Sequence, residues 1–197
     1  MIAENSKNLS LPGRPLPKPG KWTYEDWVQL PEDGNKYEVL DGELYVTPPP
    51  TFAHQDHCAE LLVRMRLHAR QFDLGKVVAG PLGVRLPNQP VPVEPDIVFV
   101  RKARESIIKA YIEGTPDLVV ELLSPGNRNY DRVKKFSVYE SAGVSEYWIV
   151  DDRDRCIEVF NLKDGAYVLS GKHDIGATAG STVLPGFGIP VADVFSS

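Results

Sequence analysis

Two carboxylates stand in apolar segments, where a charged side chain is costly. Glu121 lies inside the run 117–123, which is otherwise rich in Val and Leu, and Asp96 opens the apolar part of the run 94–100. Ionised carboxylates are almost never buried without a partner, because removing a charge from water costs several kcal/mol. Two such groups on neighbouring strands can hold a hard divalent cation. The pair therefore predicts a metal site in a reactive cleft.

Strand geometry selects Asp96 over Asp117 as the partner of Glu121. Side chains alternate along a strand, so Asp117 and Glu121 share one face of their strand. Four residues of strand nevertheless separate them by roughly 13 Å, which is too far to share one ion. Adjacent strands lie only ~4.8 Å apart, so Asp96 can reach the same ion as Glu121. We expect Asp117 to be a strand-start residue.

A hydrolytic metal site also needs a cation or base near the attacking water. The helix expected over 129–142 can supply it from the chain that follows the Glu121 strand. At 100° per residue, Val133, Phe136 and Tyr139 centre its apolar face, and Lys135 flanks that face.

Lys135 is therefore the preferred basic residue of this helix, since Lys134 falls on the far side. The alternative for Lys135 is a surface ion pair with Asp131 at i,i+4, which contributes only a few tenths of a kcal/mol.

The elements that must position these residues follow from periodicity and turn signals. We expect helices over 23–30, 54–72, 106–112 and 129–142, and strands over 37–46 (a hairpin turning at Asp41-Gly42), 76–86, 94–100, 117–123, 146–150, 155–160 and 166–169. Gly75 and Gly143 are expected to end the second and last helices. Strands alternating with helices predict an α/β fold around a mixed sheet flanked by helices, with the hairpin on its N-terminal side.

Composition describes one globular domain. The 197 residues carry a net charge of −5 and 42% hydrophobic residues. The proline-rich segment 1–20 is expected to be a flexible arm, and 21–197 a single domain. The chain has no apolar run near the ~20 residues that span a bilayer and no signal-peptide core. Its two cysteines, Cys58 and Cys156, favour a reducing compartment, and we expect the cytoplasm.

Basic residues gather after each of the two carboxylate strands, in spite of the acidic net charge. A negative bulk field disfavours tight non-specific binding of nucleic acid, but a local basic lip is compatible with it. The alternative for each residue is a solvated helix face. The clusters are Arg101, Lys102, Arg104 and Lys109, and then Arg128, Arg132, Lys134 and Lys135.

Other chemically suggestive residues have more ordinary explanations. His54 and His57 lie one helical turn apart near Cys58, but the chain offers no second ligand pair for zinc, so packing or polar contacts are favoured. Ser124 lacks the Gly-x-Ser-x-Gly turn of a nucleophile and is expected to cap the next helix or shape its loop. Tyr147 and Trp148 occupy core-like strand positions, which is favoured over stacking on bases.

These residues together resemble the PD-(D/E)XK nuclease superfamily and, within it, the Uma-type family of restriction-endonuclease-like proteins. The resemblance covers most of residues 23–195, and the ordered set of motifs is specific although each alone is weak. The motifs are 37–44, His54, 94–96, 116–125, Asp131, Lys135, Tyr139, 143–148 and 184–186.

The resemblance implies a restriction-endonuclease-like core and a metal-dependent endonuclease. Asp96 and Glu121 would be the metal ligands, for Mg²⁺ or Mn²⁺, and Lys135 would stabilise charge or position water. Glu38 matches an acidic position that could complete the metal shell; its alternative is an exposed cross-strand partner of Lys36. The implied partner is nucleic acid, with DNA preferred, and the implied assembly is a homodimer, so that two sites address two strands.

One position departs from the superfamily pattern. The motif lysine two residues after the glutamate is replaced by Leu123. The Uma-type pattern supplies a lysine from the following helix, which fits Lys135. The departure and the acidic charge also motivate an alternative function, a catalytically inactive nuclease fold kept as a binding or assembly module. Hydrolysis of another phosphoester would use the same site.

Overall fold

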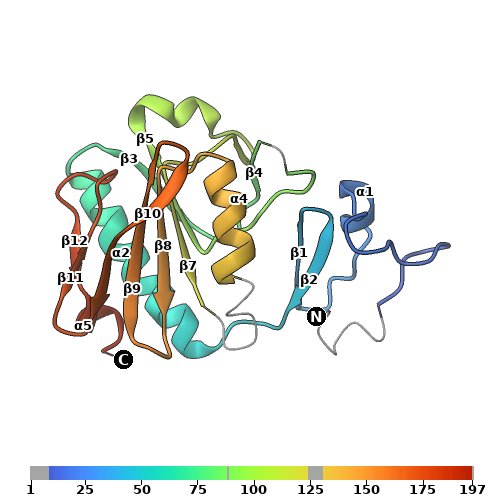
Figure 1. Cartoon of the computed structure of the whole chain (residues 1–197), viewed down its shortest axis with the longest axis horizontal. Helices are drawn as coiled ribbons and strands as arrows, with labels where there is room; N and C mark the ends of the chain where they lie inside the picture. Colours follow the sequence, from blue (N-terminus) through green and yellow to red (C-terminus); the bar gives the residue numbers. More distant parts are fainter. Residues whose placement is uncertain (1–8, 88, 124–130, 197) are drawn as a thin grey trace.

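A six-stranded mixed sheet forms the centre of the protein. The computed structural model describes residues 9–87, 89–123 and 131–196 (Figure 1). The strand order is β10-β9-β8-β7-β5-β3; β7 and β8 are parallel, and the other neighbours are antiparallel. The strands are β3 (Gly75–Ala79), β5 (Ile97–Arg101), β7 (Leu118–Leu122), β8 (Glu146–Asp151), β9 (Cys156–Lys163) and β10 (Ala166–Asp174). The predicted α/β fold is confirmed.

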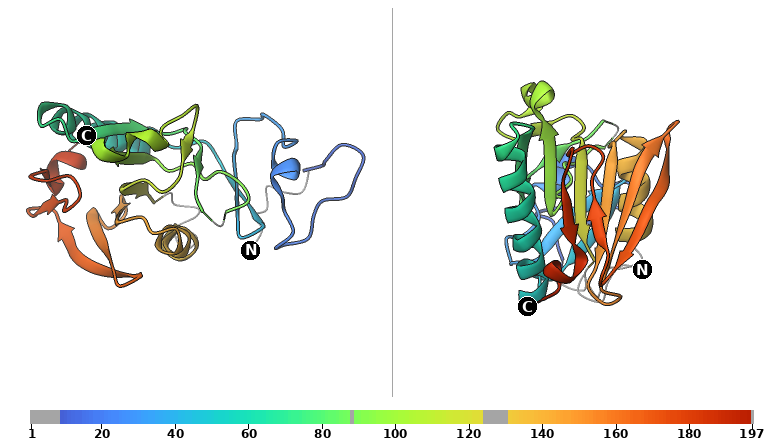
Figure 2. Two further views of the ribbon diagram at one scale, coloured as in Figure 1. Left: turned by 90° about the horizontal axis from the view of Figure 1, so that it is seen from above. Right: turned by 90° about the vertical axis from the view of Figure 1, so that its left-hand side faces the viewer.

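Helices cover both faces of this sheet (Figure 2). Helix α2 (Phe52–Gln71) packs on one face through Leu61 and Met65, and α4 (Phe136–Ser141) packs on the other through Val138 and Tyr139. Strands β7 and β8 are consequently buried along their whole length. Burial on both faces explains why their sequences are nearly continuous apolar runs without alternation.

The short first helix has the predicted start. Helix α1 (Tyr24–Trp27) begins after Thr23, whose side chain accepts from the backbone N–H of Asp26 while the Asp26 carboxylate accepts from the backbone N–H of Thr23. This reciprocal capping box satisfies two backbone donors that the helix leaves unpaired.

The predicted hairpin is also present, beside the sheet rather than within it. Strands β1 (Lys36–Leu40) and β2 (Glu43–Thr47) pair antiparallel, and Asp41 and Gly42 turn at φ values of 51° and 74°. In the described part of the N-terminal arm, Leu11 is buried in a cluster that also holds Val39 of the hairpin. The division into an arm (1–20) and one domain (21–197) stays a prediction.

Two segments between α2 and β7 differ from the prediction. The strand expected over 76–86 is split into β3 and β4 (Val84–Arg85), because the chain turns at Pro81. The helix expected over 106–112 is wrong: a 3₁₀ turn spans Lys102–Ile107 instead, and β6 (Ile112–Glu113) pairs parallel with β4. Gly75 does not end α2, which stops at Gln71 with Phe72 as its cap; Gly75 begins β3 instead. Its φ is 143°, and a Cβ there would lie 2.1 Å from the Val100 carbonyl oxygen.

The last predicted helix is irregular, and the C-terminal elements were not predicted. A π-helical turn over Asp131–Lys135 precedes α4, whereas residues 129–130 of the prediction lie outside the described residues. The additional elements are β11 (Thr178–Gly180), β12 (Gly188–Pro190) and α5 (Val191–Val194). Short three-residue strands carry too little periodicity to be recognised from sequence.

Candidate active site

A pocket of about 570 Å³ lies between the hairpin, the start of α2 and the ends of β5 and β7. All four residues proposed from the sequence line it, although they come from four separate segments. The lining residues include Lys36, Glu38, His54, Cys58, Glu94, Asp96, Glu121 and Lys135, and the rim holds Pro48, Pro49 and Pro50.

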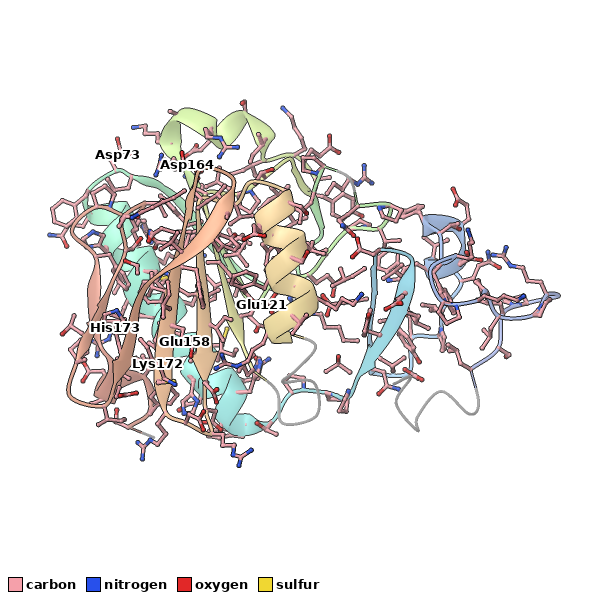
Figure 3. The ribbon with its side chains drawn as sticks, in the orientation of Figure 1. Asp73, Glu121, Glu158, Asp164, Lys172 and His173 are labelled. Carbon is pink, nitrogen blue, oxygen red and sulfur yellow. The ribbon has the colours of Figure 1, made fainter. Side chains whose placement is uncertain are left out.

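Glu121 is the most buried carboxylate of the pocket, on β7 beside α4 (Figure 3). Lys135 Nζ donates to its Oε2 at 2.9 Å, and the Tyr139 hydroxyl donates to its Oε1 at 2.6 Å. Burial raises the pKa of Glu121 to about 8, and the negative charge of Asp96 adds to this against the opposing effect of Lys135. Without a bound metal ion, the Glu121 carboxyl therefore holds a proton far more readily than an exposed glutamate does.

Lys135 is delivered to the pocket by the π-helical turn. Its side chain is 5% exposed, and its Nζ lies 3.4 Å from Glu38 Oε2 as well as bonding Glu121. Lys135 is therefore not at the surface, and the alternative ion pair with Asp131 falls on a side chain outside the described residues.

The helical-face argument that led to Lys135 was partly wrong. Val133, placed at the centre of the apolar face, is 65% exposed, whereas Phe136 and Tyr139 do pack inward. The π-helical turn changes the rotation per residue, so 100° steps fail across residues 131–135. Lys134 points away as predicted and lies 3.6 Å from Glu43 of the hairpin.

Asp96 lies across the strand pair from Glu121. In the antiparallel register of β5 and β7, Ile97 pairs with Val120. Asp96, one residue before Ile97, therefore lies opposite Glu121, one residue after Val120. Asp96 Oδ2 accepts from the Leu122 backbone N–H at 2.8 Å. Burial acts to raise the pKa of Asp96, but the hydrogen bond from His54 and the charges of two lysines hold it below its usual value.

His54 is the residue that contacts Asp96 from α2. Its Nε2 lies 3.6 Å from Asp96 Oδ2, and its Nδ1 is buried with no hydrogen-bond partner among the described residues. Burial acts to lower the pKa of His54, but the Asp96 carboxylate outweighs it and raises the pKa. His54 thus makes a polar contact at the pocket, as expected from the sequence.

Glu38 contributes the third carboxylate, from β1. It is 3% exposed, so it is not the exposed cross-strand residue of the alternative interpretation, although Lys36 does lie 3.5 Å from its Oε1. Burial acts to raise its pKa, but the charges of Lys135 and Lys36 outweigh this and hold the pKa of Glu38 below its usual value. With Glu94, the pocket therefore holds two lysines among four acidic side chains.

The departure at Leu123 has a structural counterpart. Leu123 is 5% exposed and belongs to the apolar core on the α4 side of the sheet. A lysine at this position would compete with that packing, and the ammonium that contacts Glu121 comes from Lys135 instead.

Asp117, the carboxylate that strand spacing set aside as a metal ligand, has structural partners. Asp117 accepts from the Arg101 backbone N–H at 2.9 Å and from the Arg104 guanidinium at 2.8 Å, at the other end of β7. This fits the strand-start role expected for Asp117.

Sequence reasoning gave Tyr139 no role in the site, although its spacing of four from Lys135 on one helix could have suggested a shared target.

The chemistry of the donor set fits a hard cation. Asp96 and Glu121 offer carboxylate oxygens, which Mg²⁺ and Mn²⁺ prefer. Within residues 9–87, 89–123 and 131–196, no three His, Cys, Asp or Glu side chains are already arranged around one metal position. The two histidines lie against different carboxylates: His54 is 3.6 Å from Asp96 and His57 is 3.3 Å from Asp152.

The predicted basic lip is largely neutralised. Arg132 bonds Asp151 and Glu158, Arg104 bonds Asp117, and Lys102 bonds Asp73. Tyr147 and Trp148 are fully buried, which agrees with their assignment to the core. Arg128 and Ser124 lie outside the described residues.

No helix among the described residues is long and apolar enough to cross a membrane.

One family model matches most of the chain, and two further proteins are similar to it. The family model described as "Uma2: Putative restriction endonuclease" matches residues 24–192. A relative from Synechocystis sp., described as "Uncharacterized protein slr1290", is 27% identical over 157 residues, which cover 78% of this chain and 79% of the relative.

A solved structure, described as a putative nuclease belonging to DUF820 from Anabaena variabilis, matches with a TM-score of 0.72. It shares 17% identity over 88% of this chain and 97% of that chain, so this likeness concerns the fold, which is that of the predicted restriction-endonuclease-like core. Because the family model spans most of the sequence, the chain belongs to the Uma2 family of restriction-endonuclease-like proteins.

Proposed function

We propose that this protein is a metal-dependent endonuclease that hydrolyses phosphodiester bonds in DNA. The observation that carries the proposal is the buried Lys135 ammonium, held between Glu121 and Glu38 in an open pocket that also contains Asp96. A strongly perturbed acid beside a fixed cation in a cleft is the arrangement expected of a catalytic site rather than of a structural ion pair. Family membership agrees with a hydrolase that acts on nucleic acid.

Asp96 and Glu121 are the proposed ligands of Mg²⁺ or Mn²⁺. A divalent cation bound there would polarise the scissile phosphate and lower the pKa of the attacking water. The high pKa of Glu121 means that its carboxyl must give up its proton before it can coordinate, so ligand formation is linked to proton release.

Lys135 and Glu38 would support the transferring phosphate. The ammonium is fixed by two carboxylates, so it need not reorganise when negative charge develops on the phosphate oxygens. Glu38 helps to hold Lys135 in place, and its low pKa keeps it an acceptor that can orient water. His54 lines the same pocket and contacts the Asp96 carboxylate through Nε2, so it can help to hold that proposed ligand in place.

The proposed setting is cytoplasmic and the proposed assembly a homodimer. Cys58 and Cys156 are both buried free thiols, which suits a reducing compartment. Two copies would bring two pockets to the two strands of a DNA duplex.

The test is a cleavage assay on supercoiled plasmid and on oligonucleotides with Mg²⁺ or Mn²⁺. We expect Glu121→Gln and Asp96→Asn to lower cleavage at least about 100-fold while the circular dichroism spectrum stays native. Glu43→Gln, which changes a partly exposed carboxylate of the hairpin, is the matched control and should cleave as the wild type does.

Three results would count against this function. Undiminished cleavage by both site variants would remove the assignment of the residues. A folded wild type that cleaves no DNA or RNA substrate with either metal would favour the inactive binding or assembly module. Cleavage only of small phosphoesters would favour a hydrolase that uses the same site on another phosphoester.

A further inference from the structure

Lys36 places a second ammonium group in the candidate active site, and the function proposed above gives it no part. It opens β1 and lines the pocket, as does Glu38 two residues further along the strand. Side chains two apart on a strand lie on one face, so the hairpin presents this lysine and this carboxylate together.

Acceptors from two segments fix the position of the Lys36 ammonium. Its Nζ donates to the Glu94 backbone oxygen at 2.5 Å and lies 3.5 Å from Glu38 Oε1. Lys135 Nζ lies 3.4 Å from Glu38 Oε2, which is the other oxygen of the same carboxylate. Glu38 therefore holds one lysine at each of its two oxygens, and the two positive charges flank one carboxylate.

The two ammonium groups differ in how well a ligand can reach them. The Lys135 side chain is 5% exposed, whereas the Lys36 side chain is 29% exposed. An ammonium has three donor hydrogens. Among the contacts of the described residues, the Glu94 carbonyl and Glu38 engage two of those of Lys36, which leaves one for a ligand that enters the pocket.

The charge of the pocket gives this second ammonium a purpose. Two lysines line the pocket with four carboxylates, which are Glu38, Glu94, Asp96 and Glu121. Burial acts to raise the pKa of each of these carboxyl groups, and the positive charge of Lys36 opposes it in all four, so Lys36 faces them all. With the four acids ionised and His54 neutral, both lysines and one divalent cation just balance them. Without Lys36 the metal-loaded pocket would be negative and would repel a phosphate.

We propose that Lys36 binds a phosphate of the nucleic-acid strand next to the phosphate that is cleaved, and so positions the strand across the site. The inference rests on the proposed function, which sets the cleaved phosphate beside Lys135 and the metal ligands. Because Lys36 and Lys135 flank one carboxylate, a single strand can contact both through neighbouring phosphates. A lysine binds phosphate as a point charge, so this contact carries no base preference.

A purely structural role for Lys36 makes a different prediction. Through the Glu94 carbonyl, Lys36 also ties the hairpin to the segment before β5. If that tie were its whole role, removing it would lower stability but would leave the salt dependence of DNA binding unchanged, because that dependence counts phosphate contacts.

The experiment measures the affinity of a fluorescein-labelled DNA duplex of about 20 base pairs by fluorescence anisotropy over a series of salt concentrations. Ca²⁺ replaces Mg²⁺, since it takes the same kind of oxygen ligands, and a gel after each titration checks that the DNA is intact. Lys36→Met should raise Kd about tenfold and lower the slope of log K against log salt by about 1, the value for one phosphate contact.

Three further variants separate charge from structure. Lys36→Gln keeps a donor for the Glu94 carbonyl and should lose the same slope, which also serves if Lys36→Met folds poorly. Lys36→Arg keeps the charge and should bind within about threefold of the wild type. Lys163→Met removes an exposed lysine of β9 that does not line the pocket, and as the matched control it should bind as the wild type does.

The outcomes separate this inference from the proposed function. An unchanged slope in Lys36→Met and Lys36→Gln, or a loss that Lys36→Arg does not recover, would overturn the inference even if the wild type cleaves DNA. A wild type that binds no DNA would also overturn it. A slope that depends on Lys36 in a wild type that cleaves no substrate would support it, and only the proposed endonuclease activity would then fail.

Discussion

Glu121 and Glu146 are two buried glutamates on neighbouring parallel strands, and they differ in the groups that surround them. Both are at most 2% exposed, on β7 and β8 respectively. Glu146 is surrounded by neutral donors: the Trp148 indole N–H at 2.8 Å, and the Thr182 backbone N–H and hydroxyl, each at 2.7 Å. Glu121 instead meets an ammonium and a phenol in an open pocket.

The difference separates a structural carboxylate from a chemical one. Glu146 ties the segment around Thr182 and Val183 to the sheet through hydrogen bonds and does not line the pocket. Glu121 is left with a raised pKa, and it shares its charged partner Lys135 with Glu38. Burial of a charge therefore identifies a site only when the compensating groups are themselves charged and accessible to a ligand.

The largest effect should come from removing the ammonium beside Glu121. Lys135→Met should lower the single-turnover cleavage rate about 100- to 1,000-fold, because a fixed positive charge next to the reacting phosphate is lost. Lys134→Met is the matched control, since that lysine lies on the outside of the same turn; its rate should stay within about twofold of the wild type. Equal rates for both variants would assign Lys135 a structural role like that of the Glu146 partners.

Removing the structural carboxylate should reverse the pattern. Glu146→Ala leaves several buried donors unpaired and should lower the free energy of unfolding by about 3–5 kcal/mol, as measured by urea denaturation. The cleavage rate per folded molecule should change no more than about twofold, because Glu146 does not line the pocket. A rate loss as large as that of Lys135→Met would show that the two glutamates are not separable in function.

Stability should depend on pH through Glu121. Its pKa is raised from 4.5 to about 8 on folding, so the folded state binds this proton more tightly than the unfolded state does. The contribution is complete below about pH 4.5 and is lost as pH rises through 8. In the presence of a chelator, the wild type should lose roughly 4 kcal/mol relative to Glu121→Gln between pH 5 and pH 8.5.

The measurement compares urea unfolding of the two proteins at these two pH values. A difference that stays constant with pH would mean that Glu121 is charged in the folded protein throughout, as an ordinary ion-paired carboxylate would be.

The smallest effect is expected at a third buried carboxylate, Asp26, which is 3% exposed and serves the capping box of α1. Asp26→Ala should cost about 1 kcal/mol of unfolding free energy, because it removes the reciprocal cap and the 2.7 Å contact with Arg14. Thermal unfolding gives the value, and cleavage should be unchanged. A loss above that of Glu146→Ala would mean that α1 and its surroundings contribute more to stability than a cap does.

Sequence determined the parts of this protein that local chemistry controls. The capping box at Thr23, the Asp41-Gly42 turn, α2 and the central strands all follow from residue types over a few positions, since backbone conformation and burial pattern are encoded there. It also singled out Asp96 and Glu121, because a carboxylate inside an apolar run must have a partner. Their adjacency followed from strand spacing, and the register of β5 and β7 agrees with it.

Tertiary structure decided what depends on distant segments meeting. The π-helical turn that exposes Val133 and buries Lys135 breaks the regular rotation on which the helical prediction relied. Glu38 reaches the pocket because its hairpin folds against the sheet, and Tyr139 reaches Glu121 because α4 crosses β7. Glu121 and Glu146 look alike in sequence, and only the groups that folding brings to them distinguish the two. Glu146 is held by hydrogen bonds from Trp148 and Thr182. Glu121 has a raised pKa, because a pKa is set by surrounding charge and solvent rather than by neighbours along the chain.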